Sequence, residues 1–181
     1  MGSLPEEEKE REMRILGIDP GYAIVGVGVI EYNGHSFKTL EYGAITTPAG
    51  TAFPARLQMI YSQMQEILAL YKPESMAVEK LYFNTNTTTA IDVAQARGVI
   101  LLSAQQAGVP VYEYTPLQVK QAVVGYGRAE KHQVIEMTKK LLSLTRTPKP
   151  DDVADALAIA ICHAHSAPGP AARQLLAAMG R

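Results

Sequence analysis

The chain has little of several features that would assign its class at once. It contains no tryptophan and one cysteine, Cys162, so no disulfide framework can form within it, and a buried thiol in a reducing compartment is expected. No apolar run is long enough to span a membrane, and the first residues lack the apolar core of a signal peptide. The sequence therefore predicts a globular, cytoplasmic protein with no membrane partner.

An excess of either charge is also lacking. The net charge is −1, which by itself gives no sign of a nucleic-acid partner. The charges are unevenly spread, however, because seven Lys and Arg residues stand against two Glu between Gln118 and Lys149. Such a basic stretch is either a solvated helical face or a surface that follows a phosphate backbone.

The order of the apolar segments predicts one α/β domain. We expect residues 1–12 to be a charged, disordered arm that is partly an expression remnant, residues 13–166 to be the domain, and residues 167–181 to be a tail. Three strands open the domain, and Asn33-Gly34 is typical of a hairpin turn, which makes these strands antiparallel. Helical periodicity then alternates with two further strands, which indicates a mixed sheet flanked by helices. The expected strands are 14–19, 24–32, 37–45, 75–79 and 109–114, and the expected helices are 54–71, 88–107, a short one from 115, 129–144 and 151–165.

Carboxylates stand at the ends of these apolar segments. Asp19 and Glu79 each close a predicted strand, and Asp152 and Asp155 open the last long helix on one of its faces. Because charges in apolar segments are unfavourable unless they are paired or bind a metal, we expect the four to meet at one cation site. Asp151 competes with Asp152, and we assign Asp151 to the helix N-cap and Asp152 to the site. Oxygen ligands without His or Cys favour Mg²⁺ or Mn²⁺, and two such ions side by side suit displacement at phosphorus.

Six short motifs stand out in the chain: Ile-Asp-Pro-Gly (18–21), Val-Glu-Lys (78–80), Ala-Gln-Ala-Arg-Gly (94–98), Gln-Val-Lys-Gln (118–121), Ala-Glu-Lys (129–131) and Asp-Ala-Leu-Ala-Ile-Ala (155–160). Together they resemble the motifs of the RuvC family, the bacterial Holliday-junction resolvases of the RNase H/retroviral-integrase superfamily. The resemblance runs from about Arg14 to His165. It implies an RNase H-like five-stranded sheet, with three antiparallel strands first and parallel strands after them.

The resemblance also implies an activity. It implies a homodimeric endonuclease that cuts two opposing strands of a four-way DNA junction symmetrically, in homologous recombination and repair, and leaves 5′-phosphate and 3′-hydroxyl ends. It implies the RuvA and RuvB proteins as partners and two Mg²⁺ or Mn²⁺ ions in each active site. By position, Asp19, Glu79, Asp152 and Asp155 fall on the family's metal-binding catalytic carboxylates.

The resemblance carries over to four DNA-binding positions. Lys120 and Lys131 match basic positions that contact the phosphate backbone, although either can instead be an ordinary solvated lysine. Tyr82 and Phe83 lie where the family places an aromatic residue that stacks at the opened junction centre, and Tyr82 is the closer match. The alternative is that these rings pack under their own loop.

Three other residues are not assigned to the metal site. His163 and His165 lie about three helical turns beyond Asp152, roughly 16 Å at 1.5 Å per residue, so we expect them to be structural or surface residues. Tyr126 stands between two glycines, and the sequence does not distinguish a loop anchor from a DNA contact.

The helix expected over 88–107 is apolar on nearly all sides in its middle, so its outer face needs a partner, and a second copy of the chain would supply one. Three rival interpretations remain. An actin-like or sugar-kinase-like ATPase shares the opening hairpin, but it normally needs two similar domains. A non-catalytic junction-binding scaffold predicts loss of the acids, and all four are present. Within nucleases, a related resolvase or an RNase H is the third alternative, and cleavage of four-way DNA compared with that of an RNA–DNA hybrid separates them.

Overall fold

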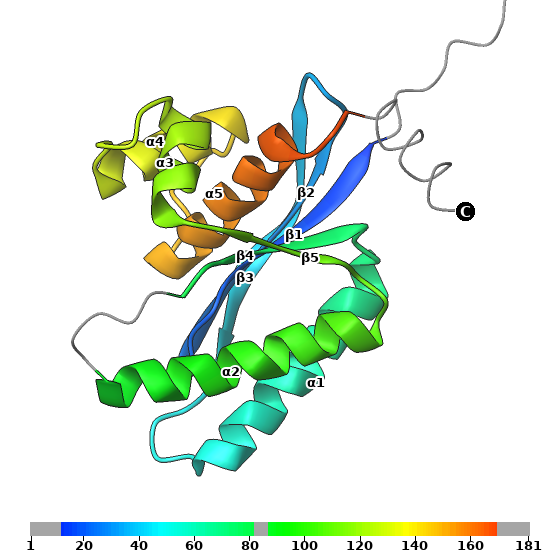
Figure 1. Ribbon diagram of the computed structural model, residues 1–181, viewed down its shortest axis with the longest axis vertical. Helices are drawn as coiled ribbons and strands as arrows, with labels where there is room; N and C mark the ends of the chain where they lie inside the picture. The colour runs from blue at the N-terminus through cyan, green and yellow to red at the C-terminus, as the bar shows by residue number, and fades with distance from the viewer. Residues whose placement is uncertain (1–11, 82–86, 170–181) are drawn as a thin grey trace, which may run out of the picture.

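The computed structural model describes residues 12–81 and 87–169. In that part, a five-stranded sheet lies between helices on both of its faces (Figure 1). The first three strands pair antiparallel, and the last two run parallel to the first, in the order β3-β2-β1-β4-β5. The mixed sheet predicted from the sequence is therefore confirmed. The strands are β1 (Met13–Asp19), β2 (Ile24–Tyr32), β3 (Phe37–Thr46), β4 (Ser75–Glu79) and β5 (Val111–Tyr114).

The helices divide into two layers. One layer holds α1 (Phe53–Tyr71) and α2 (Thr87–Gln106), and the other holds α3 (Pro116–Val124), α4 (Lys131–Leu141) and α5 (Asp151–Ser166). Alternation along the central strand β1 serves both layers, because Ile15 packs in the core under α5 and Leu16 packs in the core under α1 and α2. Both side chains are completely buried, as expected for a strand covered on both faces. None of the helices in the described ranges is long and apolar enough to cross a bilayer.

Small residues bring α5 very close to the sheet. A Cβ atom added at Gly17 of β1 would collide with the carbonyl oxygen of Ala156, and one added at Gly26 of β2 would collide with that of Asp152. Only a strand without side chains at these positions lets the backbone of α5 approach so closely. The glycines therefore fix the first turns of α5 over the end of β1.

The start of α4 and the cap residue of α5 differ from the prediction. Helix α4 begins at Lys131 rather than Ala129, because Glu130 forms the cap and its backbone N–H donates to Oε1 of Gln133 at 2.8 Å. The assignment of Asp151 to the N-cap of α5 is wrong. Pro150 occupies the cap position without a side-chain capping hydrogen bond, and Asp151 is the first helical residue.

The expected arm (1–12) and tail (167–181) lie almost wholly outside the described residues, so these boundaries stay predictions. Cys162 is buried, as predicted, and burial raises the pKa of its thiol to about 11, which leaves it uncharged at neutral pH.

Candidate active site

Two of the predicted acids come from neighbouring parallel strands. Asp19 is the last residue of β1 and Glu79 is the last residue of β4. These strands pair in register up to Ile18 and Val78, so the two acids follow at the same edge of the sheet. The end of each apolar strand thus delivers one carboxylate to one place.

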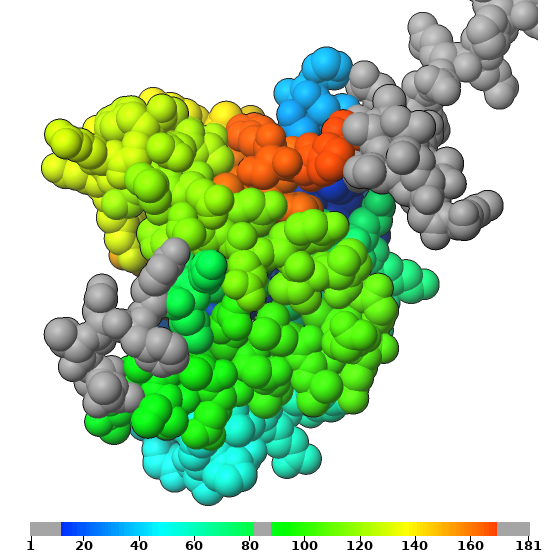
Figure 2. All heavy atoms as spheres, in the orientation of Figure 1, coloured from blue at the N-terminus to red at the C-terminus, as the bar shows by residue number. Residues whose placement is uncertain are grey.

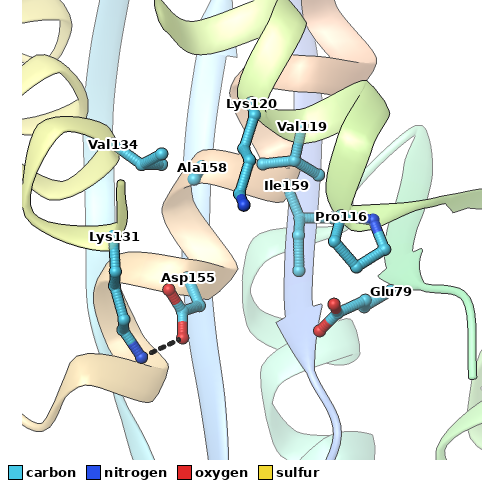
Figure 3. A pocket seen from close by; sticks show the side chains of 9 residues that line it. All are labelled: Glu79, Pro116, Val119, Lys120, Lys131, Val134, Asp155, Ala158 and Ile159. Carbon is cyan, nitrogen blue, oxygen red and sulfur yellow. Dashed lines mark hydrogen bonds and ion pairs between the residues drawn. The ribbon is translucent and has the colours of Figure 1, made fainter. Parts of the chain in front are cut away.

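Helix α5 brings the other two acids to the same edge. Asp155 lines a hollow of about 270 Å³, and Glu79 lies on another side of that hollow (Figure 3). Asp19 and Asp152 are not among the lining residues, but the charges of both belong to the same cluster, as their effect on pKa values shows. The residues that line this active-site hollow are Glu79, Pro116, Val119, Lys120, Lys131, Val134, Asp155, Ala158 and Ile159.

Packing the acids together makes their ionised forms unfavourable. Burial raises the pKa of Asp19 to about 8, and nearby negative charges add to this effect. These charges belong to Glu79, Asp155 and Asp152. Burial likewise raises the pKa of Glu79, with a further contribution from Asp155. A cation of high charge would stabilise the ionised forms of such closely packed acids most strongly.

Lys131 places a positive charge directly against the acid cluster. Its Nζ donates to Oδ2 of Asp155 at 3.1 Å and lies 3.8 Å from Oδ2 of Asp151. Partial burial lowers the pKa of Lys131, but the hydrogen bond and the charge of Asp155 raise it further, so the pKa is raised overall. The charge of Lys131 in turn lowers the pKa of Asp19 and of Glu79. Asp155 nevertheless keeps a raised pKa, because burial outweighs the ion pair.

Asp151 lies at the edge of the cluster. Oδ1 of Asp151 accepts from Nζ of Lys149 at 3.0 Å, and this bond lowers the pKa of Asp151. The Asp151 side chain is also 46% exposed, against 31% for that of Asp155, so Asp151 is the poorer candidate ligand. The charge of Asp152, not that of Asp151, contributes to the raised pKa of Asp19, which agrees with placing Asp152 at the site.

The chemistry of the donors fits a hard divalent cation, because the described residues of the site offer carboxylate oxygens without sulfur or imidazole ligands. The side chains are not arranged as a finished metal site: across the described ranges, no three His, Cys, Asp or Glu side chains are placed so that they could hold an ion together. Asp155 instead pairs with the positively charged ammonium group of Lys131.

The other predicted residues divide by location. Lys120 lines the active-site hollow and points toward it, whereas Tyr82 and Phe83 lie outside the described residues. Tyr126 is 47% exposed in the loop between α3 and α4, so it is not a buried anchor.

The two histidines are structural and surface residues, as expected. Nδ1 of His163 lies 2.7 Å from Oη of the buried Tyr114, and the ring of Tyr112 packs against the same imidazole. His165 is exposed, and its Nδ1 lies 3.1 Å from the carbonyl oxygen of Ala122.

Sequence reasoning missed the apolar wall of the hollow. Pro116 and Val119 from α3, Val134 from α4 and Ile159 from α5 line it. A signal existed in part, since Thr115-Pro116 predicts the start of α3, where Thr115 accepts from the backbone N–H of Gln118 at 3.1 Å. Which faces of three separate helices would meet is a tertiary property that no local pattern contains.

Comparison with known proteins decides the family. A family model described as crossover junction endodeoxyribonuclease RuvC matches residues 15–163. The chain belongs to the RuvC family. A RuvC relative from Brevibacillus brevis is 63% identical over 152 residues, which cover 84% of this chain and 92% of the relative. A RuvC relative from Alkaliphilus oremlandii is 60% identical over 154 residues, which cover 85% of this chain and 94% of the relative.

Solved structures agree with the family assignment. The structure of Thermus thermophilus RuvC matches with a TM-score of 0.79 and 38% identity, covering 90% of this chain and 96% of that one. The same protein in complex with Holliday junction substrate matches with a TM-score of 0.82 and 39% identity, covering 85% and 94%. The yeast mitochondrial Holliday junction resolvase, at 15% identity, shares the fold with a TM-score of 0.62 over 84% of this chain and 78% of that one. The RNase H-like fold predicted for the RuvC resemblance is therefore confirmed.

Proposed function

We propose that this chain is a crossover junction endodeoxyribonuclease that resolves Holliday junctions by metal-dependent hydrolysis of phosphodiester bonds. The family assignment gives the reaction class. The observation that supports the reaction in this molecule is the meeting of Asp19, Glu79 and Asp155, from three distant segments, at one edge of the sheet. A non-catalytic scaffold would have no need for acids held at such an electrostatic disadvantage.

The acidic residues of the site would bind metal, and the basic residues would bind the DNA backbone. Asp19, Glu79 and Asp155 would hold the Mg²⁺ or Mn²⁺ ions, together with Asp152 from the first turn of α5. Bound divalent ions supply Lewis-acid activation of water and stabilise charge that develops on the phosphate. The chain itself then has to place the phosphodiester in the hollow, and Lys120 and Lys131 are the cations beside it. The proposed products are 5′-phosphate and 3′-hydroxyl ends.

Helix α2 supports a two-fold dimer. Ile91 and Leu102 lie about three turns apart on one side of α2 and are 56% and 51% exposed, although both are large apolar residues. The same helix lies at the outside of the molecule, in the face that Figure 2 shows. A second copy of the chain, paired through this side of α2, would cover both residues and present two acid clusters to the two strands of a junction.

The proposed function also implies partner proteins and a place in the cell. The proteins named RuvA and RuvB, which the family resemblance implies, would bind and move the junction that this enzyme cuts. Such work would take place on DNA in the cytoplasm. Tyr82 and Phe83 would stack at the opened centre of the junction, where exchange of an aromatic for alanine is worth roughly 1–3 kcal/mol of binding per base.

The test is cleavage of a synthetic four-way junction with and without Mg²⁺. We expect wild type to make paired, symmetric incisions only with the metal, and Asp19→Asn to bind the junction without cutting it, because the neutral amide is a weak ligand. Linear duplex and an RNA–DNA hybrid serve as substrate controls. Preferred cleavage of the hybrid would instead indicate an RNase H, and cutting by Asp19→Asn at the wild-type rate would contradict the proposed site.

A further inference from the structure

Lys131 pairs directly with one of the acids in the cluster. Its ammonium group contacts Oδ2 of Asp155 at 3.1 Å, as the dashed line in Figure 3 shows, and lies 3.8 Å from Oδ2 of Asp151. Among the described residues, no other ion pair reaches Asp19, Glu79 or Asp155. Lys131 is therefore the resident counter-ion of the cluster.

Lys120 is a matched lysine in the same hollow. It lines the hollow and points toward it from α3, yet in the described part of the chain it forms no ion pair with the acids (Figure 3). The two lysines thus differ in one respect that matters. One neutralises a carboxylate directly, and the other only adds positive charge to the wall.

The side chain of Lys131 can leave this position without disturbing the fold. Its backbone is fixed as the first residue of α4 by the Glu130–Gln133 cap, but the side chain is 57% exposed. The long, flexible stem of lysine lets an ammonium group swing between neighbouring anions. A DNA phosphate entering the hollow would be such an anion.

We propose that Lys131 acts as a stand-in cation that substrate removes, so that the DNA backbone draws its ammonium group off Asp155 and opens the acids to the metal. This inference rests on the proposed function, since it takes a DNA phosphate as the competing anion. A dication placed at Asp155 while Lys131 remains there is repelled by a like charge a few ångströms away. Transfer of Lys131 to a phosphate removes that repulsion and restores a full carboxylate to the metal.

The exchange makes metal binding and DNA binding assist each other. By thermodynamic reciprocity, whatever factor DNA adds to metal affinity, the metal adds to DNA affinity. The site would then hold metal weakly in the absence of substrate and fill on a bound junction. Structure-selective cutting benefits from such an order, because a site without metal cannot nick DNA in passing.

The direct test measures Mg²⁺ binding by calorimetry without any DNA. We expect Lys131→Met to bind Mg²⁺ about tenfold more tightly than wild type, because the competing charge has gone from Asp155. Lys120→Met removes a charge from the same hollow but breaks no ion pair, so we expect its change to be less than about threefold. Thermal unfolding of both variants, and a Lys131→Gln variant, control for damage to the fold.

A second measurement follows the coupling, with Ca²⁺ replacing Mg²⁺ and a gel confirming that the junction stays uncut. We expect the factor by which Ca²⁺ tightens junction binding to fall at least about threefold in Lys131→Met and to persist in Lys120→Met. If Lys131→Met and Lys131→Gln bind Mg²⁺ without DNA no more tightly than Lys120→Met does, the proposal is overturned. That result would leave junction cutting by wild type untouched, so it is separable from failure of the proposed function.

Discussion

At the scale of single residues, Asp19 shows how a binding site can weaken a fold. Its carboxyl group is mostly buried among other acids, and its pKa rises from an ordinary 3.8 to about 8. A group whose pKa is raised by folding binds its proton more tightly in the folded state than in the unfolded state. The free energy of unfolding therefore falls as the pH rises through the window from about 4 to about 8.

Asparagine at this position removes the problem charge. Without divalent metal, we expect Asp19→Asn to raise the free energy of unfolding at pH 8 by about 1–3 kcal/mol, even though the variant cannot cut DNA. Urea unfolding in EDTA at pH 5 and pH 8 measures this effect. The gain should shrink at pH 5, where the folded wild-type protein keeps Asp19 protonated. A variant equally stable or less stable at pH 8 would show that the acids do not strain the fold.

At the scale of secondary-structure elements, the site depends on how closely α5 lies on the sheet. A side chain at Gly26 would meet the carbonyl oxygen of Asp152, inside the first turn of α5. We expect Gly26→Ala to destabilise the fold by about 2–3 kcal/mol, because the backbone of α5 has to shift. Junction cutting should fall further than the loss of folded protein explains.

Gly43 of β3 provides the matched control. A Cβ atom at Gly43 meets nothing within 4 Å, and the residue also lies in a strand. Chemical denaturation and initial cleavage rates of Gly43→Ala and Gly26→Ala, measured side by side, separate close approach from general loss of glycine. Similar behaviour of the two variants would show that the contact between β2 and α5 does not position the acids.

The same elements show what the sequence could and could not predict. Asp19 and Glu79 were predictable because each ends an unbroken apolar run, and such runs form buried neighbouring strands whose ends meet. The pairing of Lys131 with Asp155 was not predictable, because it depends on the angle at which α4 meets α5. The N-cap assignment of Asp151 failed because a proline at position 150 took the cap, and a preference of one residue type does not determine a helix start.

At the scale of the whole molecule, α2 exposes large apolar side chains that a partner could cover. Ile91 and Leu102 are each more than half exposed on one side of it. We expect Leu102→Glu to convert a two-fold dimer into a monomer, because burying the new charge at the interface would be strongly unfavourable. Sedimentation at micromolar concentration measures the change. The monomer should also nick one strand of a junction without the paired second cut.

Leu70 offers a control for that experiment. It is 72% exposed on α1, so Leu70→Glu places the same charge on the neighbouring helix. We expect this variant to remain a dimer. Wild type that sediments as a monomer under the same conditions would exclude α2 as a self-association surface.

In the proposed site, acids from distant parts of the chain hold divalent metal at one place. Anomalous diffraction from crystals soaked in Mn²⁺ tests this most directly. We expect the strongest manganese peak within ligand distance of Asp19, Glu79 and Asp155, at roughly 2.0–2.2 Å from carboxylate oxygens, and the peak should disappear in Asp19→Asn. Manganese bound elsewhere on the surface, with no density among these three side chains, would rule out this metal site.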